Sequence, residues 1–282
     1  GIVCARHLYT SATRLGLGLR PRPLRVRLGG GFDGMITTCP LNIAKKGNSF
    51  LIQTVHDVIP LEYVPHLDNV ALFGQRLKSC SEAFKLFVSE STRTKYERYI
   101  CQQSNCASSV IVQPPSLTMP TGEQSRLLSH NILRPSRRLR RKHGELNAFQ
   151  YVLFNSSVEP RKNLLFIIKA FRHSGLADMG IRLCVTGMLK NDDYSRQVGE
   201  QADESVLLTD YIDETTKASL FLHAMAILSP SLVEGFGIPV LDGACIGAPV
   251  VASTSGSHDE IRKMYDFKSL VWLCDTRRVT EW

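Results

Sequence analysis

The strongest constraint on the fold of this chain is an alternation of short apolar runs with longer segments of helical character. After residue 148 the apolar runs have the length and composition of buried parallel strands. Strands are expected over residues 149–155, 181–186, 205–208, 224–229, 249–252 and 269–273. Helices are expected over 162–173, 191–202, 213–223, 238–246 and 257–264. Such an order predicts a mostly parallel sheet with helices on both faces.

The first half of the chain shows the same alternation less clearly. Strands are expected over 50–55, 83–89 and 108–112, and helices over 68–83 and 90–100. Residues 1–32 show little periodicity, and their Pro and Gly clusters interrupt any regular element. A length of 282 residues suits about two domains. We therefore predict an α/β domain in 1–115, a basic linker over 116–147 and a second α/β domain in 148–282.

The segment 230–242 combines a carboxylate, a Gly-x-Gly turn and a helix start at the end of an expected strand. Gly235 and Gly237 let the backbone turn sharply and approach a ligand closely. Pro239 suits the first turn of a helix, whose free N–H groups favour an anion. Glu234 stands beside that anion pocket and is able to hold hydroxyl groups. The combination suits a phosphorylated sugar.

This segment resembles the signature of the retaining GT-B glycosyltransferases (glycosyl transferases group 1), which include bacterial mannosyltransferases. Residues 151–164 are similar to the start of that family's C-terminal domain, and 54–61 and 88–93 resemble two landmarks of its N-terminal domain. The resemblance covers roughly 33–115 and 148–275. It implies two Rossmann-like domains facing each other across a cleft. The N-terminal domain is expected to be incomplete, because few residues precede His56, and the chain is expected to be a fragment or a divergent member.

The resemblance also implies roles for the residues around the Gly-x-Gly turn. Glu234 would contact hydroxyls of the donor sugar as a catalytic residue, and Asp242 would contact the nucleotide ribose. Sugar and phosphates would meet the backbone N–H groups of Gly235, Phe236, Gly237 and Ile238. Asp242 stands where the family usually has Glu, so its carboxylate falls about 1.5 Å short. We therefore expect a weak contact with the ribose.

Lys162 is the expected cation for the leaving diphosphate, with Arg161 assisting. As the sugar C1–O bond breaks, negative charge grows on the diphosphate and must be stabilised. A compact ammonium suits phosphate oxygens. Positive charge at the start of a helix opposes the helix dipole, which indicates that an anion compensates it. The alternative is a solvated helix start. Gly187, after an expected strand, would let the nucleotide approach.

His56 follows a buried strand and precedes Asp57. In relatives a histidine at this landmark reaches across the cleft to the donor sugar. A neutral imidazole is able to polarise a hydroxyl or share the acceptor's proton. The alternative is a turn histidine bonded to backbone, with Asp57 as a cap. Ser89 is expected to cap the helix that follows it.

Charge and cysteine content limit the partners. The net charge is +8, and much of the excess lies in residues 134–143. This run suits contact with an anionic membrane, but a solvated linker is the favoured interpretation. No aromatic residues interleave with its charges, which argues against nucleic acid. The eight cysteines form no CxxC pair, so we expect reduced thiols in a cytoplasmic protein and no metal site.

The resemblance, taken with these residues, implies a retaining, metal-independent glycosyltransferase without a cofactor. It would move a hexose such as mannose from a nucleotide-diphospho-sugar to a glycan or lipid-linked acceptor in polysaccharide biosynthesis. It would work in the cytoplasm or peripherally at the inner membrane face. A non-catalytic GT-B protein that binds a nucleotide-sugar or glycan is the alternative. A sugar-nucleotide 2-epimerase is a third hypothesis, but its motifs are not evident.

Overall fold

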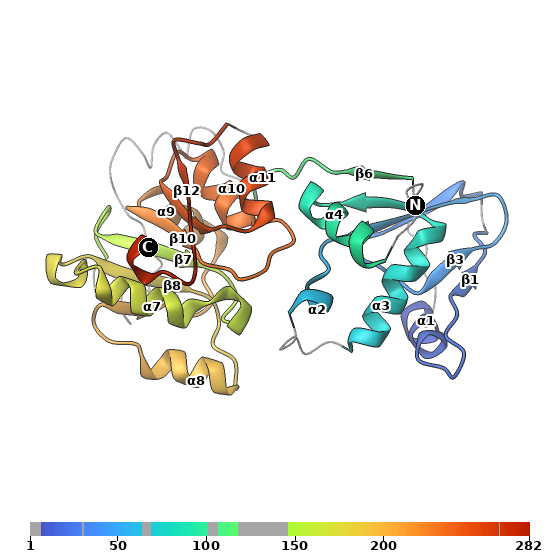
Figure 1. Cartoon of the computed structure of the whole chain (residues 1–282), viewed down its shortest axis with the longest axis horizontal. Helices are drawn as coiled ribbons and strands as arrows, with labels where there is room; N and C mark the ends of the chain where they lie inside the picture. Colours follow the sequence, from blue (N-terminus) through green and yellow to red (C-terminus); the bar gives the residue numbers. More distant parts are fainter. Residues whose placement is uncertain (1–6, 30, 64–68, 101–106, 118–145, 265) are drawn as a thin grey trace. The chain divides into compact units, whose positions relative to one another are not determined.

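The computed structural model describes residues 7–29, 31–63, 69–100, 107–117, 146–264 and 266–282. The chain divides into two compact units, Gly1–Gln113 and Pro114–Trp282 (Figure 1). Most of the expected linker, 118–145, lies outside the described residues, and so does the basic run 134–143. No helix in the described ranges is both long and apolar enough to span a membrane.

The first unit is built on a parallel sheet of four strands in the order β2-β4-β5-β6. The strands are β2 (Gly34–Thr37), β4 (Phe50–Val55), β5 (Phe84–Phe87) and β6 (Ser108–Val110). Beside them, β1 (Leu24–Val26) pairs in parallel with β3 (Ile43–Lys45). The helices are α1 (Leu8–Gly16), α2 (Ile59–Glu62), α3 (Val70–Ser79) and α4 (Glu90–Tyr99). Val55, Leu77, Phe87 and Tyr96 form one buried core.

The elements expected from residue 50 onward in this unit are present, but the expectation for residues 1–32 was wrong. That stretch contains α1 and β1. A distant side chain holds α1 and the segment before β1 in place. The buried Asn42 donates hydrogen bonds to the carbonyls of Ala12 and Arg22, both 2.9 Å long. Strands of three residues such as β1 and β3 are also too short to show a periodic pattern.

The second unit holds a six-stranded parallel sheet in the order β12-β11-β10-β7-β8-β9. Its strands are β7 (Tyr151–Asn155), β8 (Arg182–Thr186), β9 (Val206–Leu208), β10 (Ala226–Ser229), β11 (Val250–Ser253) and β12 (Val271–Cys274). Its helices are α7 (Leu164–His173), α8 (Asp193–Glu200), α9 (Glu214–Leu222), α10 (Ile238–Cys245) and α11 (Gly256–Met264). The expected elements are all present, with shifts of one or two residues at their ends.

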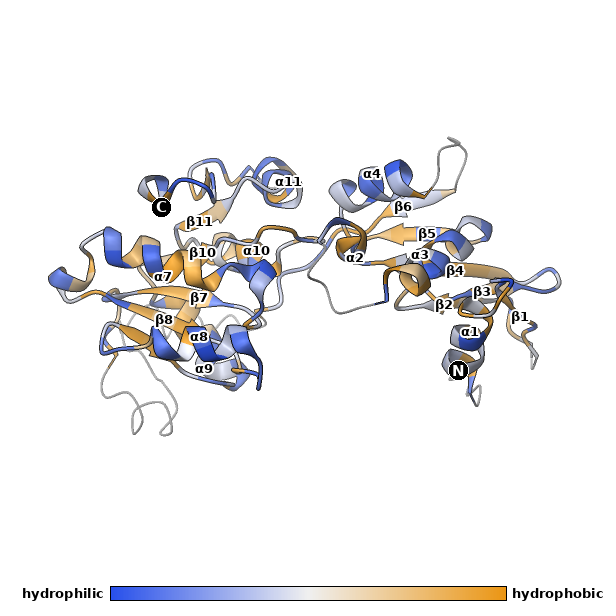
Figure 2. Cartoon of the chain, turned by 60° about the horizontal axis from the view of Figure 1, so that its bottom comes forward, coloured by the Kyte–Doolittle hydropathy of each residue, from blue (hydrophilic) through white to orange (hydrophobic). Residues whose placement is uncertain are grey.

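The core of this unit lies between the sheet and its helices. Phe154 of β7, Val185 of β8, Ile167 of α7 and Val198 of α8 belong to one buried cluster. Figure 2 shows β7 and β8 as strongly apolar segments, whereas α8 carries many polar residues. Parallel strands covered on both faces read as continuous apolar runs, which is why they could be recognised in the sequence.

Counted from the first strand of this unit, the sheet order is 3-2-1-4-5-6, the order of a doubly wound Rossmann fold. The first strand is β7 and the fourth is β10, and the two pair side by side. Strands β8 and β9 are added on one side of β7, and strands β10, β11 and β12 on the other, so the strand order reverses between β7 and β10. Ligands bind beyond the carboxyl ends of the strands at such a switch point.

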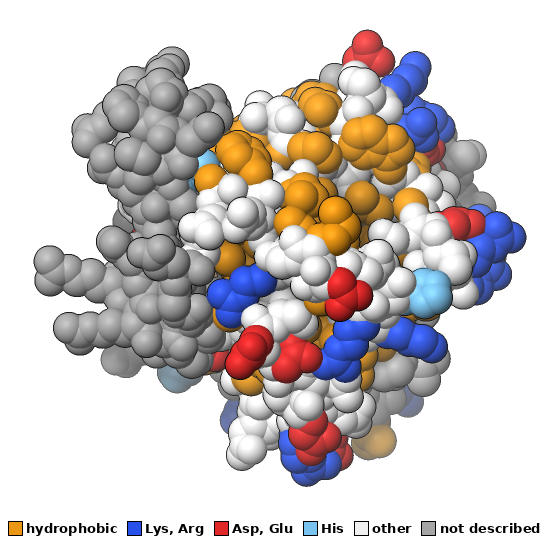
Figure 3. All heavy atoms as spheres, turned by 90° about the vertical axis from the view of Figure 1, so that its left-hand side faces the viewer, with side chains coloured by type: hydrophobic (Ala, Val, Ile, Leu, Met, Phe, Trp, Pro, Cys, Tyr) orange, Lys and Arg blue, Asp and Glu red, His pale blue; other side chains and the backbone are white. Residues whose placement is uncertain are grey.

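Charges of both signs mix on the face drawn in Figure 3. There Lys and Arg side chains stand among Asp and Glu, with hydrophobic side chains gathered near the centre. The excess of positive charge therefore forms no dominant patch among the described residues of this face.

Candidate functional site

The loops that follow β7 and β10 meet at the switch point. The backbone N–H of Leu232 donates to the carbonyl of Arg161 at 2.8 Å, which ties one loop to the other. After β7, residues Pro160–Lys162 form a single 3-10 turn, and Asn163 adopts a left-handed conformation with φ 59°. The helix expected from residue 162 therefore begins at Leu164. Lys162 lies in the turn before α7, with its side chain nearly buried.

Two cations converge on Glu234. The Lys162 Nζ donates a short hydrogen bond to Glu234 Oε1, and Arg161 Nη1 lies 3.5 Å from Glu234 Oε2. Arg161 Nε also bonds Glu159 Oε2 at 3.0 Å. Glu234 is only 7% exposed and Lys162 only 8%. The anion that the sequence required beside Lys162 is thus supplied by the protein itself, from a residue 72 positions away.

The electrostatics of Glu234 keep it ionised. Burial alone would raise the pKa of its carboxyl group, but the charge and hydrogen bond of Lys162, together with a hydrogen bond from Ser231, hold that pKa below its usual value. A buried carboxylate with a cation on each side is able to accept hydrogen bonds from hydroxyl groups. The two cations beside it are able to meet an anionic ligand.

The second glycine of the Gly-x-Gly turn packs against a histidine that the sequence analysis did not identify. Gly237 has φ 110° and comes directly before α10, and a Cβ atom there would lie 2.7 Å from the His258 ring. His258 is fully buried, and burial lowers its pKa. Its Nδ1 lies 3.1 Å from the Ser253 carbonyl, so Nδ1 carries the proton. Its Nε2 has no hydrogen-bond partner among the described residues. A lone histidine in the first turn of a helix gave no sequence signal of this contact.

Gly187 is required by the approach of two backbones. It has φ 138°, and a Cβ atom there would lie 2.1 Å from the carbonyl oxygen of Ser156, in the loop after β7. Its N–H donates to the carbonyl of Asp210 at 3.3 Å. The contact brings the ends of β7 and β8 together, and the role of Gly187 toward a nucleotide stays a prediction.

Asp242 lies in α10 and is 1% exposed, and its carboxylate already has partners. The N–H and the hydroxyl of Ser116 each donate to it at 2.5 Å, to Oδ1 and Oδ2 respectively. The N–H of Leu117 lies 3.4 Å from Oδ1. The residue expected to contact the ribose thus bonds residues 116–117, near the start of the second unit.

His56 belongs to the first unit, whereas the other expected site residues belong to the second. Its Nε2 lies 2.5 Å from the carbonyl of Thr38, and Asp57 Oδ1 accepts the N–H of Ile59 at 3.0 Å. The structure thus contains the backbone contacts of the alternative interpretation. Because a carbonyl only accepts, Nε2 carries the proton and Nδ1 is the basic atom of the neutral ring. The predicted cap at Ser89 is confirmed, since its side chain accepts the N–H of Thr92.

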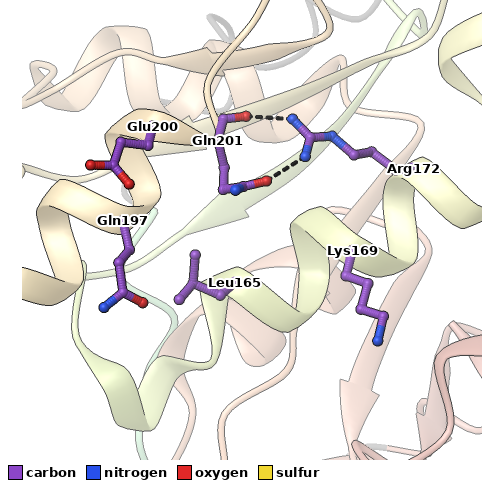
Figure 4. Close-up of a pocket in the computed structure, with 6 residues that line it drawn as sticks. All are labelled: Leu165, Lys169, Arg172, Gln197, Glu200 and Gln201. Carbon is purple, nitrogen blue, oxygen red and sulfur yellow. Dashed lines mark hydrogen bonds between the residues drawn. The ribbon is translucent and has the colours of Figure 1, made fainter.

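Two cavities in the described part of the chain lie away from the expected donor-site residues. One of about 380 Å³ lies between α7 and α8, where Arg172 bonds both the backbone and the side chain of Gln201 (Figure 4). Another, of about 530 Å³, lies in the first unit and is lined mostly by apolar side chains together with Thr38, the partner of His56. In the described part of the chain, no three His, Cys, Asp or Glu side chains are grouped as metal ligands.

Comparison with known proteins places the chain in a family. The model of the family glycosyl transferases group 1 matches residues 135–278. The O-antigen chain mannosyltransferase B of Escherichia coli is 24% identical over 231 residues, which cover 74% of this chain and 54% of that protein. The chain therefore spans about half the length of this curated relative.

Solved structures of glycosyltransferases share the fold. WaaG, a glycosyltransferase involved in lipopolysaccharide biosynthesis, aligns with a TM-score of 0.61 at 14% identity, covering 89% of this chain and 68% of WaaG. Sucrose-phosphate synthase from Thermosynechococcus elongatus aligns with a TM-score of 0.61 at 15% identity, covering 84% of this chain and 57% of that one. Anabaena HepE, solved with UDP and glucose, gives 0.54 at 16% identity, with 75% and 55% covered. The chain belongs to the glycosyl transferases group 1 family and has the GT-B fold, as its motifs predicted.

Proposed function

We propose that this protein transfers a hexose, with mannose the favoured sugar, from a nucleotide-diphospho-sugar to a glycan or lipid-linked acceptor. The observation that carries the proposal is the convergence of Lys162 and Arg161 on the buried Glu234 at the switch point of the second unit. The family supports a glycosyl transfer, and the mannosyltransferase relative favours mannose. The WaaG and HepE structures support a role in building surface glycans and a nucleotide-diphosphate donor.

In this proposal the ion cluster changes partners when the donor binds. Diphosphate oxygens take up the charge of Lys162 and Arg161, and Glu234 accepts hydroxyls of the sugar in exchange. Fixed cations stabilise the charge that grows on the leaving diphosphate without reorganisation of water. The backbone N–H groups of 235–238 and the start of α10 add positive potential. Protein cations in this position are the basis for proposing a metal-independent reaction, and the family resemblance is the basis for proposing retention.

The acceptor side is proposed from the first unit. Nδ1 of His56 is the ring nitrogen left free by the bond between Nε2 and the Thr38 carbonyl, so it is the atom that would receive the acceptor's proton. The cavity of about 530 Å³ lined by Thr38 offers room for an acceptor with an apolar part. Contact of residues 134–143 with an anionic membrane stays a prediction, because that run lies outside the described residues. The cytoplasmic location is likewise a prediction.

One observation favours a second candidate, a non-catalytic nucleotide-sugar-binding protein. The Asp242 carboxylate, which the family resemblance assigns to the ribose, is engaged by Ser116. A protein with that carboxylate blocked would hold a donor loosely or without turnover.

Turnover of the donor separates the two candidates. The full chain is incubated with GDP-mannose and UDP-glucose, and released nucleotide is measured with and without EDTA. We expect Lys162→Met to lower kcat at least ~100-fold, the effect of removing one group that stabilises the developing charge. Glu234→Gln should lower kcat as well, because a neutral amide accepts the sugar hydroxyls more weakly than a carboxylate does. Lys263→Met removes an exposed ion pair with Asp259 and serves as the control with unchanged turnover. Donor binding without turnover in the wild type would favour the binding protein, and loss of turnover in EDTA would contradict metal independence.

A further inference from the structure

Asp242 is a buried carboxylate whose side-chain partners come from one short segment. It is 1% exposed, and in the described ranges it forms no ion pair with Lys or Arg. Oδ1 accepts the N–H groups of Ser116 and Leu117, and Oδ2 accepts the Ser116 hydroxyl. An ionised carboxylate needs such donors once it leaves water. The segment at 116–117 is therefore what keeps Asp242 satisfied in its buried position.

The pattern of donors resembles that of a ribose. Ser116 presents two adjacent donors, a backbone N–H and a hydroxyl, one to each oxygen of the carboxylate. A ribose ring presents two adjacent hydroxyl groups, which can reach the two oxygens of one carboxylate in the same way. Because each oxygen is already occupied, a ribose can bond Asp242 only by taking the place of Ser116 or by sharing an oxygen with it.

We propose that Ser116 is a positioning residue that sets the selectivity of the donor site for the ribose. It does so by occupying the Asp242 carboxylate, which keeps the carboxylate from bonding the nucleotide. This inference rests on the proposed function, because it assumes that a nucleotide binds beside α10. When Ser116 holds Asp242, the 2′-hydroxyl of the nucleotide gains little from the carboxylate. The apparent affinity gained from this contact is then scaled by the fraction of molecules in which the carboxylate is unoccupied.

The hydroxyl of Ser116 is the part of this contact that a substitution removes cleanly. Ser116→Ala leaves the backbone N–H on Oδ1 and takes away the one partner that Oδ2 has among the described residues. Oδ2 is then free to accept a ribose hydroxyl. Ser116→Thr keeps the hydroxyl and serves as the matched control. Ser116 is exposed, so both variants are expected to fold, and Ser116→Gly, which also lacks the hydroxyl, is a second test variant.

The experiment compares ribonucleotides with their 2′-deoxy counterparts. Calorimetry gives the Kd values of GDP, 2′-deoxy-GDP, UDP and 2′-deoxy-UDP for the wild type and the three Ser116 variants. For whichever base binds, we expect the deoxy form to bind within about threefold of the ribo form in the wild type and in Ser116→Thr. In Ser116→Ala and Ser116→Gly we expect the deoxy form to bind about tenfold more weakly than the ribo form, the size of one hydrogen bond to a charged group. Adding Asp242→Asn to Ser116→Ala should return the ratio to that of the wild type.

Other outcomes would overturn the inference. A tenfold ratio that is the same in the wild type and in Ser116→Ala means that Asp242 holds the ribose regardless of Ser116. A ratio near one in every variant means that Asp242 does not reach the ribose. A merely structural role for Ser116 would weaken ribo and deoxy forms alike and leave their ratio unchanged. Failure of every nucleotide to bind the wild type and all variants would instead contradict the proposed function, and this inference with it.

Discussion

Replacing Lys162 with methionine tests whether the buried ion pair with Glu234 stabilises the second unit. The side chain of Lys162 is 10% exposed and that of Glu234 is 8% exposed, counted without the backbone. Removing the cation therefore leaves a buried carboxylate without its main partner. Breaking a buried pair on one side costs ~3–5 kcal/mol of unfolding free energy. Arg161 remains 3.5 Å from the other carboxylate oxygen and keeps part of the interaction. We therefore expect Lys162→Met to lower the unfolding free energy by about 3 kcal/mol at pH 7.

The loss should depend on pH in a defined direction. Although burial would raise it, the pKa of Glu234 in the folded protein lies below its ordinary value of 4.5, because Lys162 stabilises the charged form. A carboxyl group with a lowered folded pKa stabilises the protein above its unfolded pKa, and this contribution disappears as the pH falls through the folded pKa. The difference between wild type and Lys162→Met should therefore be full at pH 7 and shrink as the pH falls below about 4.5.

Urea unfolding followed by tryptophan fluorescence measures this effect in the right part of the chain. Both tryptophans of the sequence, Trp272 and Trp282, lie in the second unit. The Trp282 ring packs against Phe166 of α7 at 5.8 Å between ring centres, so its emission reports the packing of that helix. Lys263→Met is the matched control. Its pair with Asp259 is exposed, and its loss should cost less than ~0.5 kcal/mol.

A loss below ~1 kcal/mol for Lys162→Met at pH 7, or an equal loss at pH 7 and pH 4, would refute this reasoning. The double variant Lys162→Met, Glu234→Leu provides an internal check. With both charges gone, the buried site holds two apolar side chains, and most of the lost stability should return.

Three further outcomes are expected. Gly187→Ala should lower the unfolding free energy by ~3 kcal/mol in urea titrations, because its Cβ would lie 2.1 Å from the Ser156 carbonyl oxygen at a φ of 138°. Gly199→Ala, in the last turn of α8 with open space around it, should instead raise it by ~0.5 kcal/mol. Burial raises the pKa of the Cys184 thiol to about 12, so iodoacetamide at pH 8 should alkylate the exposed Cys39 and spare Cys184, as read by mass spectrometry.

The positions of strands, helices and helix caps could be predicted from the amino-acid sequence. The strand at 50–55 was predicted to the residue, and β7 to within two residues, because buried parallel strands leave continuous apolar runs. The cap at Ser89 and the helix start after Gly237 follow from the chemistry of one or two neighbouring residues. These signals are short-range, so the chain order of strands and helices could be read before any contact was known.

The partners of the charged groups depended on the tertiary structure. Glu234 meets Lys162 because the 3-2-1-4-5-6 order sets β10 beside β7, and no local pattern encodes that pairing. Asp242 bonds Ser116, which lies 126 residues away, and not an open pocket. The ring of His258 packs against Gly237, a contact that also depends on how distant elements are brought together. Sequence periodicity tells which face of an element is buried, whereas the identity of the group across from it depends on how distant elements are brought together.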